Sequence, residues 1–135
     1  MRIFLDANIL FAAAFTDGAI RRLIRELLAR DHVLVVDGYV VEEARRNLSA
    51  KSRDGTRELE RLIPKLEMAS IAMPASGRIA AALPEKDQPV LASAAQAGCD
   101  ALVTGDRRHF GRLFGHTIGG VAIYEPAALA EQLLL

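Results

Sequence analysis

Short apolar runs alternate with amphipathic stretches along this chain, and that alternation restricts the fold more than any other feature. Continuous apolar runs at residues 3–5, 33–36 and 101–103 are typical of strands buried on both faces of a sheet. Between the first two runs, apolar residues recur every three or four positions from Ile20 to Leu28, which predicts an amphipathic helix. Strands that alternate with helices predict an α/β fold with a parallel sheet covered on both faces.

The same patterns place the remaining elements. Helices are expected at 40–49, 54–68, 76–83, 87–97 and 107–113 and from Pro126 onward, and we expect Pro64 to kink or shorten the second of these. Weaker strands are expected at 70–73 and 118–124. The 135 residues fit one domain spanning 1–135. The prediction is a three-layer α/β/α fold with a small, mostly parallel sheet of four to five strands.

Composition narrows the class of protein. Hydrophobic residues make up 51% of the chain but aromatic residues only 5%, so the core must be aliphatic, and a binding surface of stacked aromatics is disfavoured. The 17 basic and 17 acidic residues cancel, unlike the basic balance of many nucleic-acid binders. A single cysteine, Cys99, excludes an internal disulfide and a multi-cysteine zinc site. Because the sequence shows no signal peptide and no membrane-spanning run, we expect a cytoplasmic protein with no membrane partner.

Acidic residues follow two of the predicted strands. Asp6 closes the first strand, and Asp106 follows the strand at 101–103. If these strands are neighbours where the strand order reverses, their carboxylates share one crevice. Asp6, Asp87 and Asp106 each also precede a predicted helix, so a simple N-cap role is the alternative for each. Glu43 lies near the edge of its helix's apolar face, whereas Glu42 is expected to point to water.

Four carboxylates in one pocket would need a cation, because they repel one another. A magnesium or manganese ion (Mg²⁺ or Mn²⁺) prefers oxygen ligands. One or two such ions would make water a stronger nucleophile and screen the charge of a phosphate.

Four segments carry a resemblance to a known family. They are residues 3–8 (Ile-Phe-Leu-Asp-Ala-Asn), 41–44 (Val-Glu-Glu-Ala), 87–92 (Asp-Gln-Pro-Val-Leu-Ala) and 102–110 (Leu-Val-Thr-Gly-Asp-Arg-Arg-His-Phe). In this order they resemble the PIN-domain nucleases, whose bacterial members include the toxins of toxin–antitoxin pairs. The resemblance implies a metal-dependent endoribonuclease with Asp6, Glu43, Asp87 and Asp106 as metal ligands and catalytic acids. It also implies polar support from Asn8 and Thr104, RNA as substrate, and an antitoxin or a second copy of the chain as partner.

Basic residues suggest where a substrate would bind. Arg107 and Arg108 directly follow Asp106, so phosphates that approach the metal would meet them. The basic stretch at 45–65 is as well explained by a solvated helix face. The three histidines, His32, His109 and His116, show no metal-ligand spacing and receive no role.

Three alternatives to the nuclease remain open: a haloacid-dehalogenase-like phosphatase, a receiver-like signalling module and a non-catalytic PIN-like binding module. The phosphatases need a second Asp two residues after the first, where this chain has Asn8. The receiver would need paired acids in the first loop and a Lys after the last strand, and the sequence offers neither. The apolar C-terminal residues 127–135 either cover the sheet or form a partner contact, and we favour the first interpretation.

Overall fold

The computed structural model describes residues 1–134 and contains one six-stranded sheet with the strand order β3-β2-β1-β4-β6-β5. The strands are β1 (Arg2–Leu5), β2 (Val33–Asp37), β3 (Glu67–Ala69), β4 (Ala101–Val103), β5 (Thr117–Ile118) and β6 (Val121–Tyr124). The helices are α1 (Ala7–Phe15), α2 (Ala19–Ala29), α3 (Gly38–Ser49), α4 (Arg53–Leu62), α5 (Gly77–Ala82), α6 (Gln88–Gln96), α7 (Arg107–Phe110) and α8 (Pro126–Leu134), with short 3₁₀ turns η1 (Ile63–Lys65), η2 (Glu85–Asp87) and η3 (Gly111–Leu113).

The strand order reverses beside β1. The chain passes from β1 outward to β2 and β3, then returns to place β4 on the other side of β1. Ile3 is in register with Leu34 of β2 on one side and with Ala101 of β4 on the other, and both pairings are parallel. The β1 and β4 strands are therefore neighbours at the reversal, as the placement of Asp6 and Asp106 in one crevice requires.

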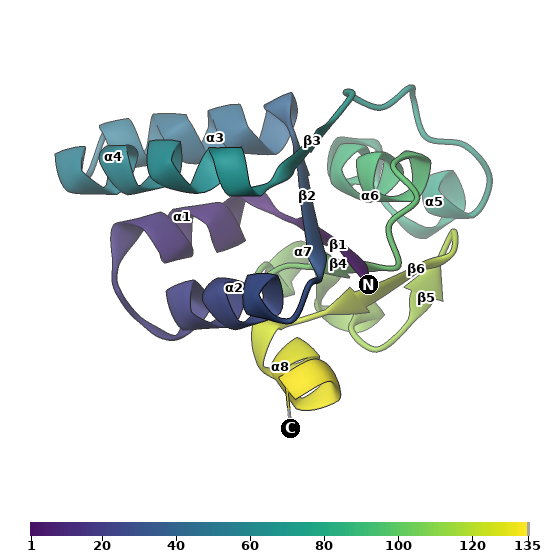
Figure 1. Ribbon diagram of the computed structural model, residues 1–135. Helices are drawn as coiled ribbons and strands as arrows, with labels where there is room; N and C mark the ends of the chain where they lie inside the picture. Colours follow the sequence, from purple (N-terminus) through teal and green to yellow (C-terminus); the bar gives the residue numbers. More distant parts are fainter. Residues whose placement is uncertain (135) are drawn as a thin grey trace.

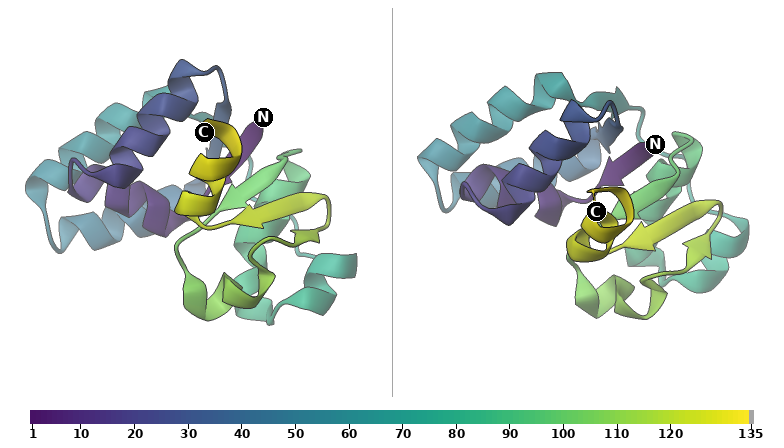
Figure 2. Two further views of the ribbon diagram at one scale, coloured as in Figure 1. Left: turned by 90° about the horizontal axis from the view of Figure 1, so that it is seen from below. Right: turned by 60° about the horizontal axis from the view of Figure 1, so that its bottom comes forward.

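Helices cover both faces of the sheet. In Figure 1, helices α1 to α4 gather at the left and α5 and α6 at the right, and the two views of Figure 2 keep the sheet between these groups. The strands β1, β2 and β4 are almost entirely buried, and Phe4, Leu34 and Leu102 have 1% or less of their surface exposed. Burial on both faces explains why these strands are continuous apolar runs. The predicted α/β/α layering with a mostly parallel sheet is confirmed.

Two edge strands differ from the prediction. The third strand lies at Glu67–Ala69, not at 70–73, and Arg2 pairs with Glu67 across the sheet edge. The single strand expected at 118–124 is divided into two strands in the structure, because Gly119 and Gly120 adopt positive φ and turn the chain between β5 and the antiparallel β6. The sheet therefore has six strands, one more than the upper end of the expectation. The helix expected at 54–68 ends at Leu62, two residues before Pro64, because proline has no backbone N–H to donate within a helix.

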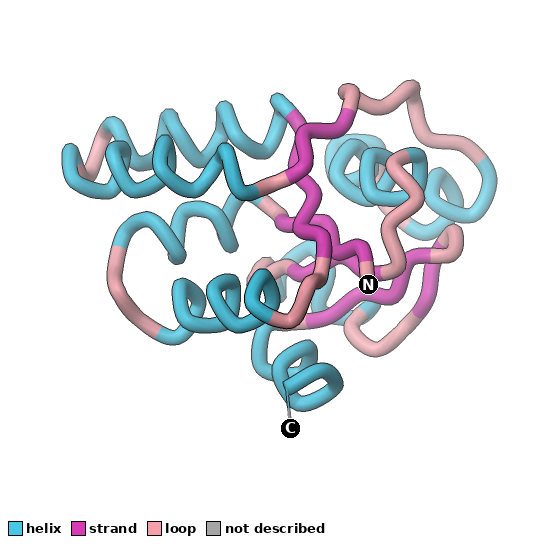
Figure 3. Tube along the Cα trace, viewed as in Figure 1, coloured by secondary structure: helices cyan, strands magenta, loops and turns pink. Residues whose placement is uncertain are grey.

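The loop at 70–76, between β3 and α5, is the long pink run at the upper right of Figure 3. At the other end of the molecule, α8 packs against α2 and β6 through the fully buried Leu129, so this helix covers the sheet. Cys99 is buried, and burial raises the pKa of its thiol to about 11. Within residues 1–134, no helix is both long and apolar enough to cross a bilayer.

Candidate active site

The site lies where β1 and β4 end side by side. A pocket of about 190 Å³ opens there, and we call it the carboxylate pocket. Its lining comes from four separate segments of the chain: Asp6, Asn8, Tyr39, Glu43, Lys86, Asp87, Val90, Asp106, His109 and Phe110. All four acids proposed from the sequence are among these residues, although up to 100 positions separate them in the chain.

Asp6 is the deepest of the acids, with 6% of its surface exposed. Its carboxylate accepts hydrogen bonds from the Ala7 backbone N–H at 2.8 Å, the Thr104 hydroxyl at 2.8 Å and the Asn8 amide at 3.1 Å. Burial raises the pKa of Asp6 above its ordinary value, and these three bonds oppose the rise without cancelling it. Asp6 therefore caps α1 and lines the pocket, so the two roles considered from the sequence coexist.

Thr104 and Asn8 brace the two strand ends against each other. The Thr104 hydroxyl, fully buried after β4, donates to Asp6 and accepts the Asp106 backbone N–H at 3.1 Å. The Asn8 side-chain carbonyl accepts the Gly105 N–H at 2.7 Å, and its amide donates to Asp6 and, at 3.3 Å, to Thr104. Both residues thus hydrogen-bond to Asp6, and they fix the orientation of its carboxylate.

Glu43 reaches the pocket from α3. The buried Asp37 caps this helix by accepting the Val40 N–H at 3.0 Å, which sets the first turn, and Glu43 follows on the side facing the strand ends. Burial, together with the charges of Asp6 and Asp106, raises the pKa of Glu43. The neighbouring Glu42 is exposed and pairs with Arg45 at 3.1 Å. Of the two glutamates, Glu43 is the one that belongs to the pocket.

His109 joins two of the acids, which the sequence did not suggest. Its Nδ1 lies 2.6 Å from the Asp106 carboxylate, and its Nε2 lies 4.0 Å from Asp87. Burial alone would raise the pKa of Asp106, but hydrogen bonds from the ring and backbone of His109 lower it below its ordinary value. Asp106 also caps α7 through the His109 N–H. The role of His109 could have been found from its position, because a residue three positions after a helix-capping acid lies on the same face of the helix as that acid.

A basic pocket adjoins the carboxylate pocket and shares Lys86, Asp87 and His109 with it. This basic pocket, of about 380 Å³, is also lined by Pro84, Arg108 and Arg112. Arg108 therefore lies where the sequence placed a phosphate contact, and Lys86 and Arg112 join it. Arg107 instead pairs with Glu125 at 3.1 Å and points away from this pocket's lining.

The family assignment follows from a comparison with known domains. The profile of the PIN domain matches residues 2–108, which include all four acids of the carboxylate pocket. This chain belongs to the PIN-domain family.

Solved structures agree with this PIN-domain assignment at the level of the fold. VapBC2 from Rickettsia felis bound to a promoter DNA fragment superposes with a TM-score of 0.68 at 17% identity, covering 93% of this chain and 98% of that chain. DNA-bound VapBC from Salmonella typhimurium gives 0.64 at 22% identity, with the same coverage. Mycobacterium tuberculosis VapC20, described as a sarcin–ricin loop cleaving toxin, gives 0.55 at 15% identity, covering 86% and 98%. A comparison with curated protein sequences found no match.

The donor set of this PIN domain fits a hard divalent cation. Carboxylate oxygens are the ligands that Mg²⁺ and Mn²⁺ prefer, and the mutual repulsion seen at Glu43 is the kind of strain a cation relieves. In residues 1–134, no three acidic, histidine or cysteine side chains already stand close enough to hold one ion.

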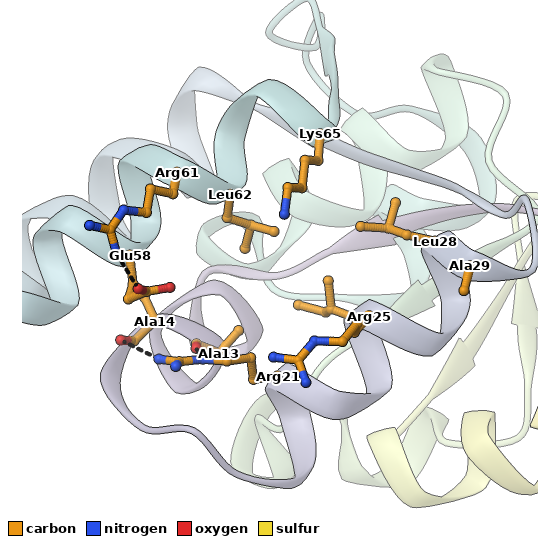
Figure 4. Close-up of a pocket in the computed structure, with 11 residues that line it drawn as sticks. Ala13, Ala14, Arg21, Arg25, Leu28, Ala29, Glu58, Arg61, Leu62 and Lys65 are labelled. Carbon is orange, nitrogen blue, oxygen red and sulfur yellow. Dashed lines mark hydrogen bonds and ion pairs between the residues drawn. The ribbon is translucent and has the colours of Figure 1, made fainter.

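A second hollow lies away from the acids, between α1, α2 and α4. Figure 4 shows this cleft of about 370 Å³, with Arg25 and Lys65 facing each other across its apolar floor. Two other cations at its walls are already engaged: Arg61 pairs with Glu58 at 2.7 Å, and Arg21 donates to the Ala13 carbonyl at 2.7 Å. In the basic stretch 45–65, Arg45 pairs with Glu60 and Arg57 with Asp54 in the same way. The solvated-face interpretation accounts for these residues.

Proposed function

We propose that this PIN domain is a metal-dependent endoribonuclease that hydrolyses RNA phosphodiester bonds in the carboxylate pocket. One observation carries the proposal: Asp6, Glu43, Asp87 and Asp106 come from four distant segments and line one small pocket at the strand reversal. Helix capping alone does not account for this set, because Glu43 lies inside α3 and caps no helix. Asp87 makes the point most clearly, because it stands at the N-cap position of α6 without a capping side-chain bond in the described chain.

These four acids would hold one or two Mg²⁺ or Mn²⁺ ions. When bound, such an ion supplies positive charge that strengthens a water nucleophile and screens the scissile phosphate. Asn8 and Thr104 keep the Asp6 carboxylate in a fixed orientation toward the pocket. On the open side, Lys86, Arg108 and Arg112 would bind the phosphates that flank the scissile bond. The net neutral chain thus presents a local positive surface beside its acids.

RNA as the substrate and a toxin role rest on similarity. VapC20 is described as a toxin that cleaves the sarcin–ricin loop, and VapBC and FitAB structures contain paired proteins. By analogy, this chain would be the toxin of a toxin–antitoxin pair. The cleft between α1, α2 and α4, with Arg25 and Lys65 above an apolar floor, would suit an apolar antitoxin segment carrying acidic residues.

The direct test is cleavage of 5′-labelled single-stranded RNA by the purified chain with Mn²⁺, with Mg²⁺ and with EDTA. We expect cleavage with either metal, none with EDTA, and a loss of about 100-fold or more in Asp6→Asn and Glu43→Gln. Glu42→Gln is the matched control, because this exposed glutamate is adjacent in sequence and lies outside the pocket. Equal activity in Glu42→Gln and Glu43→Gln would refute the assignment of the acids.

The same preparations separate the alternatives. A phosphatase would hydrolyse p-nitrophenyl phosphate, and a receiver would become phosphorylated by acetyl phosphate. The phosphatase reaction is not expected, because the residue two after Asp6 is Asn8, whose amide already bonds Asp6 and Gly105 and has no carboxyl proton to donate. The receiver reaction is not expected, because the sequence has neither paired acids in the first loop nor a Lys after the last strand. A non-catalytic module would bind RNA without cutting it under any metal.

A further inference from the structure

A third hollow, which the proposed function does not use, lies beside the carboxylate pocket at the same edge of the sheet. It measures about 640 Å³ and is formed by the end of β2, the loop 70–76 and the start of α6. Tyr39 lines both hollows, and the η2–α6 segment divides them, since Lys86 and Asp87 face one and Glu85 and Gln88 the other. We call this cavity the side pocket. It therefore lies next to the position that a substrate strand would take in the carboxylate pocket.

The walls of the side pocket are apolar and exposed. Ile71 and Met73 have 70% and 73% of their surface exposed, although they belong to a loop that is tied down. The Met73 backbone N–H donates to the Gln96 side chain at 2.9 Å, and the Gln96 amide donates back to the Met73 carbonyl at 2.9 Å. These two hydrogen bonds to α6 thus hold the Met73 backbone in place, while the side chains of Ile71 and Met73 stay exposed to solvent. With Tyr39 and Pro89 they offer flat and apolar surfaces to a planar ring.

The carboxylates of the side pocket are hydrogen-bond acceptors, and the Tyr39 hydroxyl can donate or accept. Asp37, 1% exposed, accepts from the Val40 N–H and, at 2.5 Å, from the Ser93 hydroxyl, so the hydroxyl proton is already used. The Gln88 amide donates to the Ala80 and Leu83 carbonyls and is likewise engaged. Glu85 adds a carboxylate at the rim. Among the lining residues described for this pocket, none is basic, so a phosphate would be repelled and an uncharged ring with N–H donors is favoured.

Of the four RNA bases, guanine fits this chemistry best. Its N1–H and N2–H groups are adjacent donors on one edge, which a carboxylate with two acceptor oxygens can bind together. Adenine and cytosine place a ring acceptor beside their amino group, and uracil flanks its single N–H with two carbonyls, so each would set an acceptor against Glu85. We propose that the side pocket binds a guanine base of the substrate RNA next to the scissile phosphate, with Glu85 as the residue that selects it. This inference rests on the proposed endoribonuclease function.

Binding can be tested without cleavage, so a failure here is distinguishable from a failure of the nuclease. The chain has three methionines, and Met68, about half exposed on β3 and outside the side pocket, serves as an internal control for Met73. Methyl-¹³C methionine NMR is recorded in EDTA while the RNA pentamers UUGUU, UUAUU, UUCUU and UUUUU are added. We expect the Met73 signal to move with UUGUU at concentrations about tenfold below those needed by the others, while the Met68 signal stays. No movement of Met73, or equal movement with all four RNAs, overturns the proposal.

Cleavage then tests the role of Glu85. With Mn²⁺ and a random-sequence RNA, the wild type should show guanine enriched at one fixed position beside the cut, and Glu85→Gln should reduce that preference about tenfold. Met73→Ser should raise KM for guanine-containing RNA with little change in kcat, and Met68→Ser should do neither. The alternative occupant of the side pocket is the surface of another protein molecule. If Met73→Ser changes the oligomeric state in light scattering and leaves base preference intact, the side pocket is a protein contact and the guanine assignment is wrong.

Discussion

Replacing Thr104 with valine is the sharpest test of the hydrogen bonds that join the ends of β1 and β4. Valine keeps the side chain's shape but removes one donor and two acceptor positions. The main loss is the 2.8 Å hydrogen bond from Thr104 to the buried Asp6 carboxylate. The Asp106 N–H, which also loses its acceptor, is only partly buried and can bind water instead, and Asn8 keeps its bond to Asp6. A hydrogen bond to a charged group contributes about 1.5–3 kcal/mol, so we expect Thr104→Val to lower the free energy of unfolding by about 2 kcal/mol. For a chain of this size that corresponds to about 8 °C in Tm.

The pH dependence of this loss identifies its cause. The bond from Thr104 lowers the pKa of Asp6, so it stabilises the charged carboxylate more than the neutral acid. The Thr104→Val defect should therefore be largest at pH 7 and shrink as the pH falls through the folded-state pKa of Asp6, which lies above 3.8. Urea unfolding of the metal-free protein at pH 7 and pH 4 measures this. Thr104→Ser, which keeps the hydroxyl and removes one methyl, should cost about 1 kcal/mol at both pH values. Equal losses for the valine variant at the two pH values would show that packing, not the bond to Asp6, is what valine disturbs.

Three further results are expected. Mn²⁺ at one hundred times its Kd should stabilise the wild type by about 2.7 kcal/mol in thermal unfolding and leave Asp6→Asn unchanged; an equal gain in both would place the ion elsewhere. Because burial raises the folded-state pKa of Asp6, the folded protein binds that proton more tightly, so acidification from pH 7 toward 4 should favour the metal-free wild type over Asp6→Asn, and parallel pH profiles would contradict this. Leu129→Ala should cost about 3 kcal/mol in urea unfolding, because this fully buried side chain joins α8 to α2 and β6, and a loss below about 1 kcal/mol would mean that α8 is dispensable.

The central sheet was predictable because its strands are buried on both faces. Phe4, Leu34 and Leu102 belong to runs with no polar residue, and such runs have few alternatives in a chain of this length. The edges were not predictable in the same way. The β3 strand is a three-residue edge strand that pairs with β2 and contains Glu67, whose partner Arg2 lies 65 residues away, and no local pattern reports these pairings. A glycine pair inside an apolar run was interpreted as part of one strand, whereas the positive φ of both residues marks the turn between β5 and β6.

The acids of the site were predictable and most of their surroundings were not. Asp6 and Asp106 stand at strand ends, and parallel strands bring such ends together once their order is known. The apolar face of α3 favoured Glu43 over Glu42 but left both open, and the folded chain places only Glu43 among the described lining residues of the pocket. By contrast, Arg107 is drawn away by Glu125, 18 residues later, and His109 comes near Asp87 only when α7 folds beside η2. These contacts depend on tertiary packing that neither periodicity nor spacing encodes.

Helix capping and the proposed metal binding are complementary uses of the same acids. A carboxylate buried without partners takes up a proton, which would remove its value as a cation ligand. At Asp6 and Asp106 the free N–H groups that open α1 and α7 donate to the carboxylates, and at Asp106 the ring of His109 adds the hydrogen bond that most lowers the pKa. The helix starts therefore favour the charged form of both acids, although at Asp6 burial still leaves the pKa raised. The same two carboxylates thus cap a helix and line the pocket, so the N-cap interpretation of Asp6 and Asp106 is compatible with the proposed site and is not an alternative to it.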